Sequence, residues 1–316
     1  MKQYRKKAKQ PKLAMGQKRS RMIANIIIYC ILVLMSVIWI LPFVFIFIES
    51  LRITPKGIAG YVISSDYTYG FYNYLKLWKL VAAEEQDAMV QFPRWFLNTL
   101  VTAIFTAIFQ TIFVLSMSYT LSRLRFKGRK FLMNFMLILG MFPGFLSMIL
   151  LYKVLGWAGF IGGPEEWYLL FFQGSVPGLI IVYCASSGMG YYVSKGYFDT
   201  IPKSLDEAAR VDGANRFQVF YKVIIPLSKP IVIYTILTAF MGPWGDFMFA
   251  SYVSLKQGNA YNVAAGLKEM TAATSIGTRY TLFCAGGVCV AIPITALFMF
   301  LQRYYVEGVT GGAVKG

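Results

Sequence analysis

The sequence is poor in the side chains that usually perform covalent or metal chemistry. It has no histidine, which removes the commonest general base and the commonest metal ligand. Its cysteines (Cys30, Cys184, Cys284 and Cys289) all lie in apolar segments without a CxxC pair, which is typical of buried structural thiols. The GxxxxGK[ST] loop that cradles nucleotide phosphates is also missing. We therefore expect a non-catalytic chain with no metal or cofactor.

Asp246 is the only charge in the middle of a long apolar segment, and it follows Gly242-Pro243-Trp244-Gly245. The glycines and the proline weaken a helix at this point. Because a carboxylate at membrane depth is costly, we expect it to face a cavity, the bundle interior or a partner. Trp244 and Asp246 then either line a path for a polar solute, or Asp246 lies near the outer interface and supports packing. Asn98 is a weaker candidate of the same kind.

Composition places these residues in a membrane protein. The chain has 316 residues, of which 57% are hydrophobic and only 14% charged. A bilayer crossing takes about 20 apolar residues. The segments that satisfy this length are roughly 23–48, 96–122, 131–152, 169–192, 231–252 and 279–302. We expect an all-α integral membrane protein with six transmembrane helices.

The basic residues indicate how the chain is oriented. The net charge is +17, but Lys and Arg lie between apolar runs rather than on a polar domain, which argues against a nucleic-acid partner. With the N-terminus inside, 22 of the 31 basic residues fall in the inner regions 1–22, 123–130, 193–230 and 303–316. Since cytoplasmic loops retain positive charge, both termini are predicted to be cytoplasmic.

This topology divides the chain into four parts. They are a basic cytoplasmic tail (1–22), a first span with an external loop (23–95), a core transmembrane domain (96–302) and a cytoplasmic C-terminal tail (303–316). The external region 49–95 is rich in Tyr and Trp, which either anchor it at the membrane interface or form a docking surface. The sequence leaves both open.

The inner loop 193–230 is unusually well patterned. Ser204 with Glu207 three residues later predicts a capping box and a helix from Leu205. Asp212-Gly213 predicts its end, because glycine adopts the left-handed conformation readily. A second helix is predicted over 214–224, with Phe217, Phe220, Tyr221 and Ile224 on one side, before Pro226 and Pro230 break it.

These residues resemble the EAA coupling motif of ABC importer permeases. The motif positions are Glu207, Ala208, Ala209, Gly213, Val223, Ile225 and Pro226, with Asp212 beside the glycine. The resemblance implies a type I ABC importer permease fold, in which this helix–turn–helix docks on a cytoplasmic ATPase subunit. Closure of the ATPases would then move the membrane helices.

Other segments are similar to the maltose/maltodextrin-type second permease subunit of carbohydrate importers. They are Met141-Phe142-Pro143, residues 195–201 and the C-terminal run 306–316. The resemblance implies a tail that reaches between two ATPases, with Gly308, Gly311 and Gly312 giving an extended, flexible backbone. It also implies that the external loop 253–278 faces a solute-binding protein, with Lys256, Gln257, Gly258 and Asn259 near its tip.

Together these features predict an ATP-driven oligosaccharide importer. The expected partners are a homologous second permease, two ABC ATPases, an extracellular or periplasmic binding protein, the oligosaccharide and the lipid bilayer. An importer for a non-sugar solute such as a polyamine is the alternative, because the coupling loop is shared across substrates. A secondary transporter or a scaffold is less favoured, since paired intramembrane charges and internal repeats are not evident.

Overall fold

The computed structural model describes residues 15–53, 67–141, 144–160, 176–253, 262–271 and 276–313. Within these ranges the chain is helical, apart from turns and an isolated β-bridge between Arg52 and Tyr69. Three helices are each long and apolar enough to cross a bilayer: α1 (Met15–Leu51), α3 (Phe92–Arg123) and α14 (Ile276–Ala313). The all-α membrane class is thus confirmed.

Two of the other predicted spans are interrupted within the described residues. Helices α4 (Arg129–Met141) and α5 (Gly144–Trp157) flank 142–143, which lie outside the described residues. Helix α6 (Val176–Ala185) meets α7 (Gly188–Asp199) at 44°, and α11 (Lys229–Gly245) is followed after a break by α12 (Met248–Val253). The sequence did not indicate the break between α6 and α7, whereas the break after Gly245 lies where Gly242, Pro243 and Gly245 predict a weakened helix.

A close approach of two backbones accompanies the first of these breaks. Gly188 begins α7, and a Cβ added there would lie 3.1 Å from the carbonyl oxygen of Met136 in α4. Glycine therefore lets α7 pack directly against α4. Hydropathy registers apolar length and not such contacts, which is why the break was missed.

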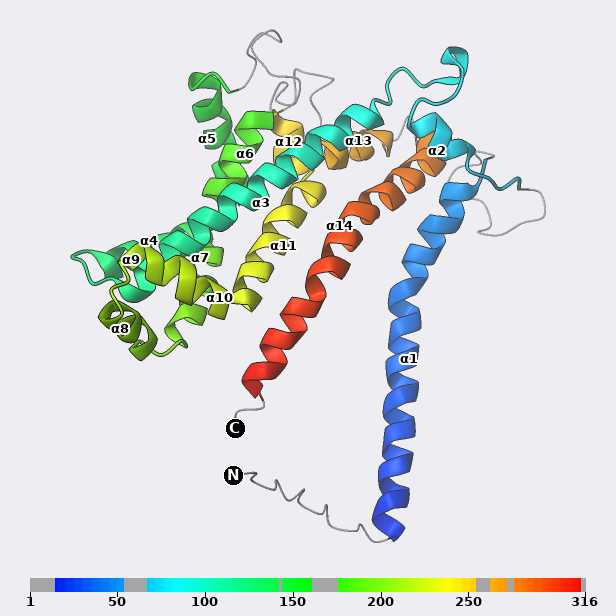
Figure 1. The fold of residues 1–316 in the computed structure, drawn as a ribbon. Coiled ribbons are helices and arrows are strands. Elements are labelled where there is room, and N and C mark those ends of the chain that lie inside the picture. The colour runs from blue at the N-terminus through cyan, green and yellow to red at the C-terminus, as the bar shows by residue number, and fades with distance from the viewer. Residues whose placement is uncertain are drawn as a thin grey trace.

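Helix α3 runs through the middle of the bundle and packs against α6, α7 and α11 (Figure 1). Helix α14 packs on α11 and on α1, and Figure 1 shows α1 diverging from the bundle toward its N-terminal end. The apolar side chains of α1 between Met22 and Val44 are largely exposed. Such a surface suits contact with lipid or with another apolar subunit.

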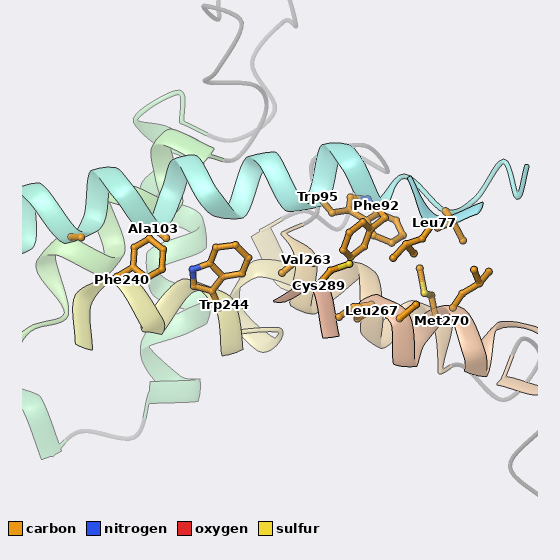
Figure 2. Packing of buried hydrophobic residues seen from close by; sticks show 14 of the residues in the cluster. Leu77, Phe92, Trp95, Ala103, Phe240, Trp244, Val263, Leu267, Met270 and Cys289 are labelled. Atoms are coloured by element: carbon orange, nitrogen blue, oxygen red, sulfur yellow. The ribbon is translucent and has the colours of Figure 1, made fainter. Parts of the chain in front are cut away.

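The largest buried cluster joins α3, α11, α14, the short helix α2 (Tyr72–Leu77) and α13 (Val263–Met270) (Figure 2). Trp78 in the external region packs edge-on against Phe92 and Phe96, and Asp87 forms an ion pair with Arg279 of α14. Part of the aromatic content of 49–95 therefore serves packing within the chain.

The ends of the helices divide between two sides of the molecule. The N-terminal end of α1, the C-terminal end of α14 and helix α8 (Ser204–Val211) lie toward the lower side of Figure 1, while α2, α12 and α13 lie toward the upper side. This grouping agrees with the predicted topology, in which both ends and the inner loop share one face.

Helix α14 continues to Ala313 and includes Gly308, Gly311 and Gly312. The predicted extended backbone at these glycines was therefore wrong. A helix that has already formed adds one hydrogen bond for each further residue, so it can propagate through glycines that would not start one.

Candidate coupling site and membrane cavity

The first helix of the inner loop, α8, begins at Ser204, with Lys203 as its N-cap. No side chain caps it, so the predicted Ser204–Glu207 capping box was wrong. The reason is positional, because Ser204 is already inside the first helical turn and the Glu207 N–H donates to the Lys203 carbonyl at 3.1 Å.

The predicted end of this helix is confirmed. Helix α8 stops at Val211, and Gly213 has φ 86°, in the left-handed region that favours glycine. The Gly213 N–H donates to the Arg210 carbonyl and the Ala214 N–H to the Ala209 carbonyl, which closes the helix end. The chain is thereby redirected into the second helix within a few residues.

The second helix consists of three consecutive parts: α9 (Arg216–Gln218), a π-helical segment η3 (Val219–Ile224) and α10 (Ile225–Leu227). Its start is fixed by a reciprocal capping box, in which Asn215 and Gln218 exchange side-chain and backbone hydrogen bonds of 2.8 and 2.9 Å.

The predicted break of the second helix between Pro226 and Pro230 is confirmed. Pro226 lies inside α10, and the helical run continues to Leu227 before an 86° bend at Ser228 leads into α11. Proline has no N–H to donate, so it is tolerated where the π-helical segment gives way to α-helix.

The π-helical turn also changes which side chains face the core. Val219 and Ile224 are fully buried against Tyr119, Phe198 and other apolar residues, but Phe217 is 72% exposed and Tyr221 58% exposed. These two rings stack on each other with centroids 6.2 Å apart. The predicted single face of Phe217, Phe220, Tyr221 and Ile224 assumed a regular α-helix, and the wider turn divides it.

A buried ion pair that the sequence did not suggest attaches α8 to the membrane helices. Arg123, the last residue of α3, lies 2.9 Å from the Asp206 carboxylate, and their side chains are 2% and 7% exposed. Arg123 also donates to the Ile201 carbonyl at 2.9 Å. Next to it, Ser122 donates to Asp199 at 2.6 Å. A basic residue at the end of a span is normally interpreted as a topology signal, so only the three-dimensional contact distinguishes Arg123.

Helix α8 therefore has one attached face and one free face. Asp206 points into the bundle, while Glu207, Ala208 and Val211 are exposed, with Val211 at 89%. The small side chain of Ala208 beside an exposed carboxylate and an exposed valine forms a surface that another protein can approach closely.

A cavity of about 640 Å³ lies between the broken helices. Its lining includes Asp246, Tyr183, Tyr191 and Ser186 among apolar side chains from α4 to α7 and α12. Asp246 accepts a hydrogen bond from the Tyr183 hydroxyl at 2.7 Å and from the Phe249 N–H at 3.0 Å, and so caps α12. Both expectations for Asp246 therefore have a structural counterpart: it supports packing and it faces a cavity.

Trp244 and Asn98 do not line this cavity. Trp244 is 3% exposed and packs against Phe96 and Phe240 in the main cluster (Figure 2), and Asn98 is 8% exposed on α3. Trp244 and Asp246 lie on either side of the end of α11 at Gly245. Trp244 packs into the main apolar cluster, whereas Asp246 faces the cavity. The loop residues Lys256, Gln257, Gly258 and Asn259 lie outside the described residues.

A helical bundle with several apolar spans, two of them interrupted, and an exposed helix pair at one end is typical of a multi-pass membrane transport protein. The chain belongs to the family of binding-protein-dependent transport system inner membrane components, whose pattern matches residues 114–311. This identifies it as the permease component of a transport system in the inner membrane.

Individual relatives agree over most of the chain. It is 32% identical over 288 residues to the galactooligosaccharides transport system permease protein GanQ of Bacillus subtilis (strain 168), covering 91% of this chain and 94% of the relative. It is 30% identical over 307 residues to the maltodextrin transport system permease protein MalD of Streptococcus pneumoniae (strain ATCC BAA-255 / R6), covering 95% of this chain and 98% of that relative.

The fold also matches a solved structure. A crystal structure of a bacterial ABC transporter involved in the import of the acidic polysaccharide alginate has a chain with a TM-score of 0.69 and 21% identity, covering 94% of this chain and all of that chain. This likeness concerns the fold alone.

Proposed function

We propose that this chain is one of two permease subunits of an ATP-driven oligosaccharide importer. The similarity to galactooligosaccharide and maltodextrin permeases supports the substrate class. The observation that carries the mechanism is α8, which is ion-paired to α3 on one face and exposed at Glu207, Ala208 and Val211 on the other. A helix attached in this way transmits a push from a bound protein to the membrane helices.

The proposed partners are a homologous permease, two cytoplasmic ABC ATPases that hydrolyse the ATP, and an external solute-binding protein. The termini and α8 are placed on the cytoplasmic side, which follows the positive charge of the inner regions. The loop around Lys256–Asn259 is proposed to face the binding protein. ATPase closure would shift the population between inward-open and outward-open states.

Co-purification of the ATPase with a tagged permease tests this docking. Glu207→Lys and Gly213→Pro should each lower ATPase recovery at least about tenfold, because they reverse the exposed charge or remove the turn. Glu269→Lys is the matched control, since it reverses an exposed charge on α13 at the other side of the molecule. Equal ATPase recovery from Glu207→Lys, Gly213→Pro and the unchanged chain would contradict the proposed role.

We further propose that Asp246 contacts the sugar in transit. Its carboxylate is the only charge lining the cavity among the described residues, which favours uncharged oligosaccharides over polyanionic ones. Asp246→Asn keeps an acceptor for capping α12 and removes the charge. We expect its uptake of neutral oligosaccharides to fall, with unchanged binding-protein affinity. Unaltered uptake would limit Asp246 to capping.

The C-terminal end of α14 is proposed to reach the interface between the ATPases as a helix. Removal of 308–316 should leave assembly intact and reduce ATPase stimulation by the loaded binding protein. A truncated chain with full stimulation would exclude this role for the tail.

A further inference from the structure

A second cavity, of about 590 Å³, is lined by residues at the junction of α3 and α4. Figure 1 shows this junction at the same end of the bundle as α8. Its lining consists of Arg125, Phe126, Gly128, Arg129, Lys130, Phe131 and Met133. Three of these residues are cations and none is acidic. Within the described part of the chain, none of the three cations forms an ion pair. The lining of the cavity thus carries three positive charges and no carboxylate.

The apolar part of the lining continues along α4. Gly128, with φ 88°, turns the chain between the two helices, and the Leu132 N–H donates to its carbonyl at 2.9 Å. Phe131 is 73% exposed and stacks on Phe135 with centroids 5.9 Å apart. Further along α4, Ile138 and Leu139 are exposed as well, so one side of this helix presents apolar side chains outward. A cationic pocket therefore lies at the end of an apolar helix surface.

We propose that this cavity binds the headgroup of an anionic phospholipid of the inner leaflet, with an acyl chain lying along α4. Cations provide the charge and hydrogen-bond donors for a phosphate, and the exposed aromatic and aliphatic surface suits the hydrocarbon. The assignment to the inner leaflet rests on the proposed topology. Topology alone explains positive charge in this loop, but not a cavity combined with an exposed aromatic stack.

The lipid site is connected to the coupling loop. Arg129 lies near enough to Asp199 for its charge to act on that carboxylate, which also accepts from Ser122 and pairs with Lys195 at 2.6 Å. Ser122 adjoins Arg123, which holds α8. A phosphate bound at Arg129 would weaken the effect of that positive charge on Asp199. Lipid occupancy should therefore affect how efficiently α8 transmits movement.

The test uses the complete transporter reconstituted in nanodiscs of phosphatidylcholine, alone or with phosphatidylglycerol, followed by native mass spectrometry. The triple variant Arg125→Gln, Arg129→Gln, Lys130→Gln keeps Arg123 and Lys127 as topology signals. We expect it to lower phosphatidylglycerol retention at least about tenfold, as loss of three juxtamembrane charges implies. The Arg-to-Lys variants at 125 and 129 should retain the lipid.

Lys6→Gln, Lys7→Gln, Lys9→Gln in the basic tail is the matched control, since it removes the same number of positive charges from another part of the sequence. Equal loss of lipid from both triple variants would overturn the site in favour of general attraction. Displacement of the lipid by millimolar inorganic phosphate would show a free-phosphate site instead. Loss of ATPase co-purification from the cavity variant, with lipid retained, would show an ATPase contact. Each of these readouts is independent of sugar uptake.

Discussion

Arg123 is the residue on which the attachment of α8 to the membrane helices depends most. Its guanidinium pairs with Asp206 out of contact with water and also binds the Ile201 carbonyl. Removal of one member of a buried pair leaves the other charge without compensation, which typically costs about 3–5 kcal/mol. We expect Arg123→Ala to lower the free energy of unfolding by about that amount, measured by thermal unfolding in detergent.

The matched control for this prediction is Arg210→Ala, which removes an exposed arginine from α8 itself. It should change stability by less than about 0.5 kcal/mol. The double variant Arg123→Leu, Asp206→Leu should recover much of the stability, because neither charge then remains buried alone. It should still show less transport per ATP hydrolysed. Full coupling in the double variant would mean that the pair serves stability only.

At the scale of elements, the turn between α8 and α9 depends on backbone conformation rather than on space. A Cβ at Gly213 would have no atom within 4 Å, but φ is 86°. Gly213→Ala should therefore destabilise the turn by about 1–2 kcal/mol and reduce the ATPase activity that the loaded binding protein stimulates. Gly213→Asn should have a smaller effect on both, because asparagine tolerates the left-handed conformation better. Gly196→Ala, also without neighbours but inside α7, should be neutral or slightly stabilising.

The packing of α13 on α3 depends, by contrast, on space. A Cβ at Gly266 would collide with the Trp95 ring, which is itself 2% exposed. Gly266→Ala should reduce thermal stability by about 1–3 kcal/mol or more, since overpacking forces the tryptophan out of position. Gly242→Ala, where a Cβ has no atom within 4 Å, is the control and should not destabilise in the same way. Similar melting temperatures for the two variants would contradict this packing.

At the scale of the whole molecule, the helices place the coupling loop and the external region on opposite sides. In a chain without native cysteines, Val211→Cys should react with a membrane-impermeant maleimide only after the cells are opened. Leu80→Cys should react in intact cells. Both side chains are more than 70% exposed, at 89% and 71%, so each is accessible when the permease is expressed without the ATPases. Labelling of Val211→Cys in intact cells would reverse the proposed topology.

The sequence alone determined those features that depend on local pattern and composition. The lengths of the apolar segments predict the membrane class and the long helices α1, α3 and α14. The hydrocarbon core of a bilayer requires an apolar segment of that length, however the helices pack against one another. The glycine turn at Gly213 was also predictable, because a positive φ selects glycine locally. The exposed Glu207 and Ala208 occupy motif positions that can be recognised without a structure.

Only the tertiary structure decided which residues meet. Arg123 and Asp206 are far apart in the sequence, and no local pattern pairs them. The different surroundings of Trp244 and Asp246 follow from where α11 ends against α3 and α6. The break between α6 and α7 and the π-helical turn at Val219–Ile224 likewise accompany contacts between helices, to which hydrophobic periodicity does not respond.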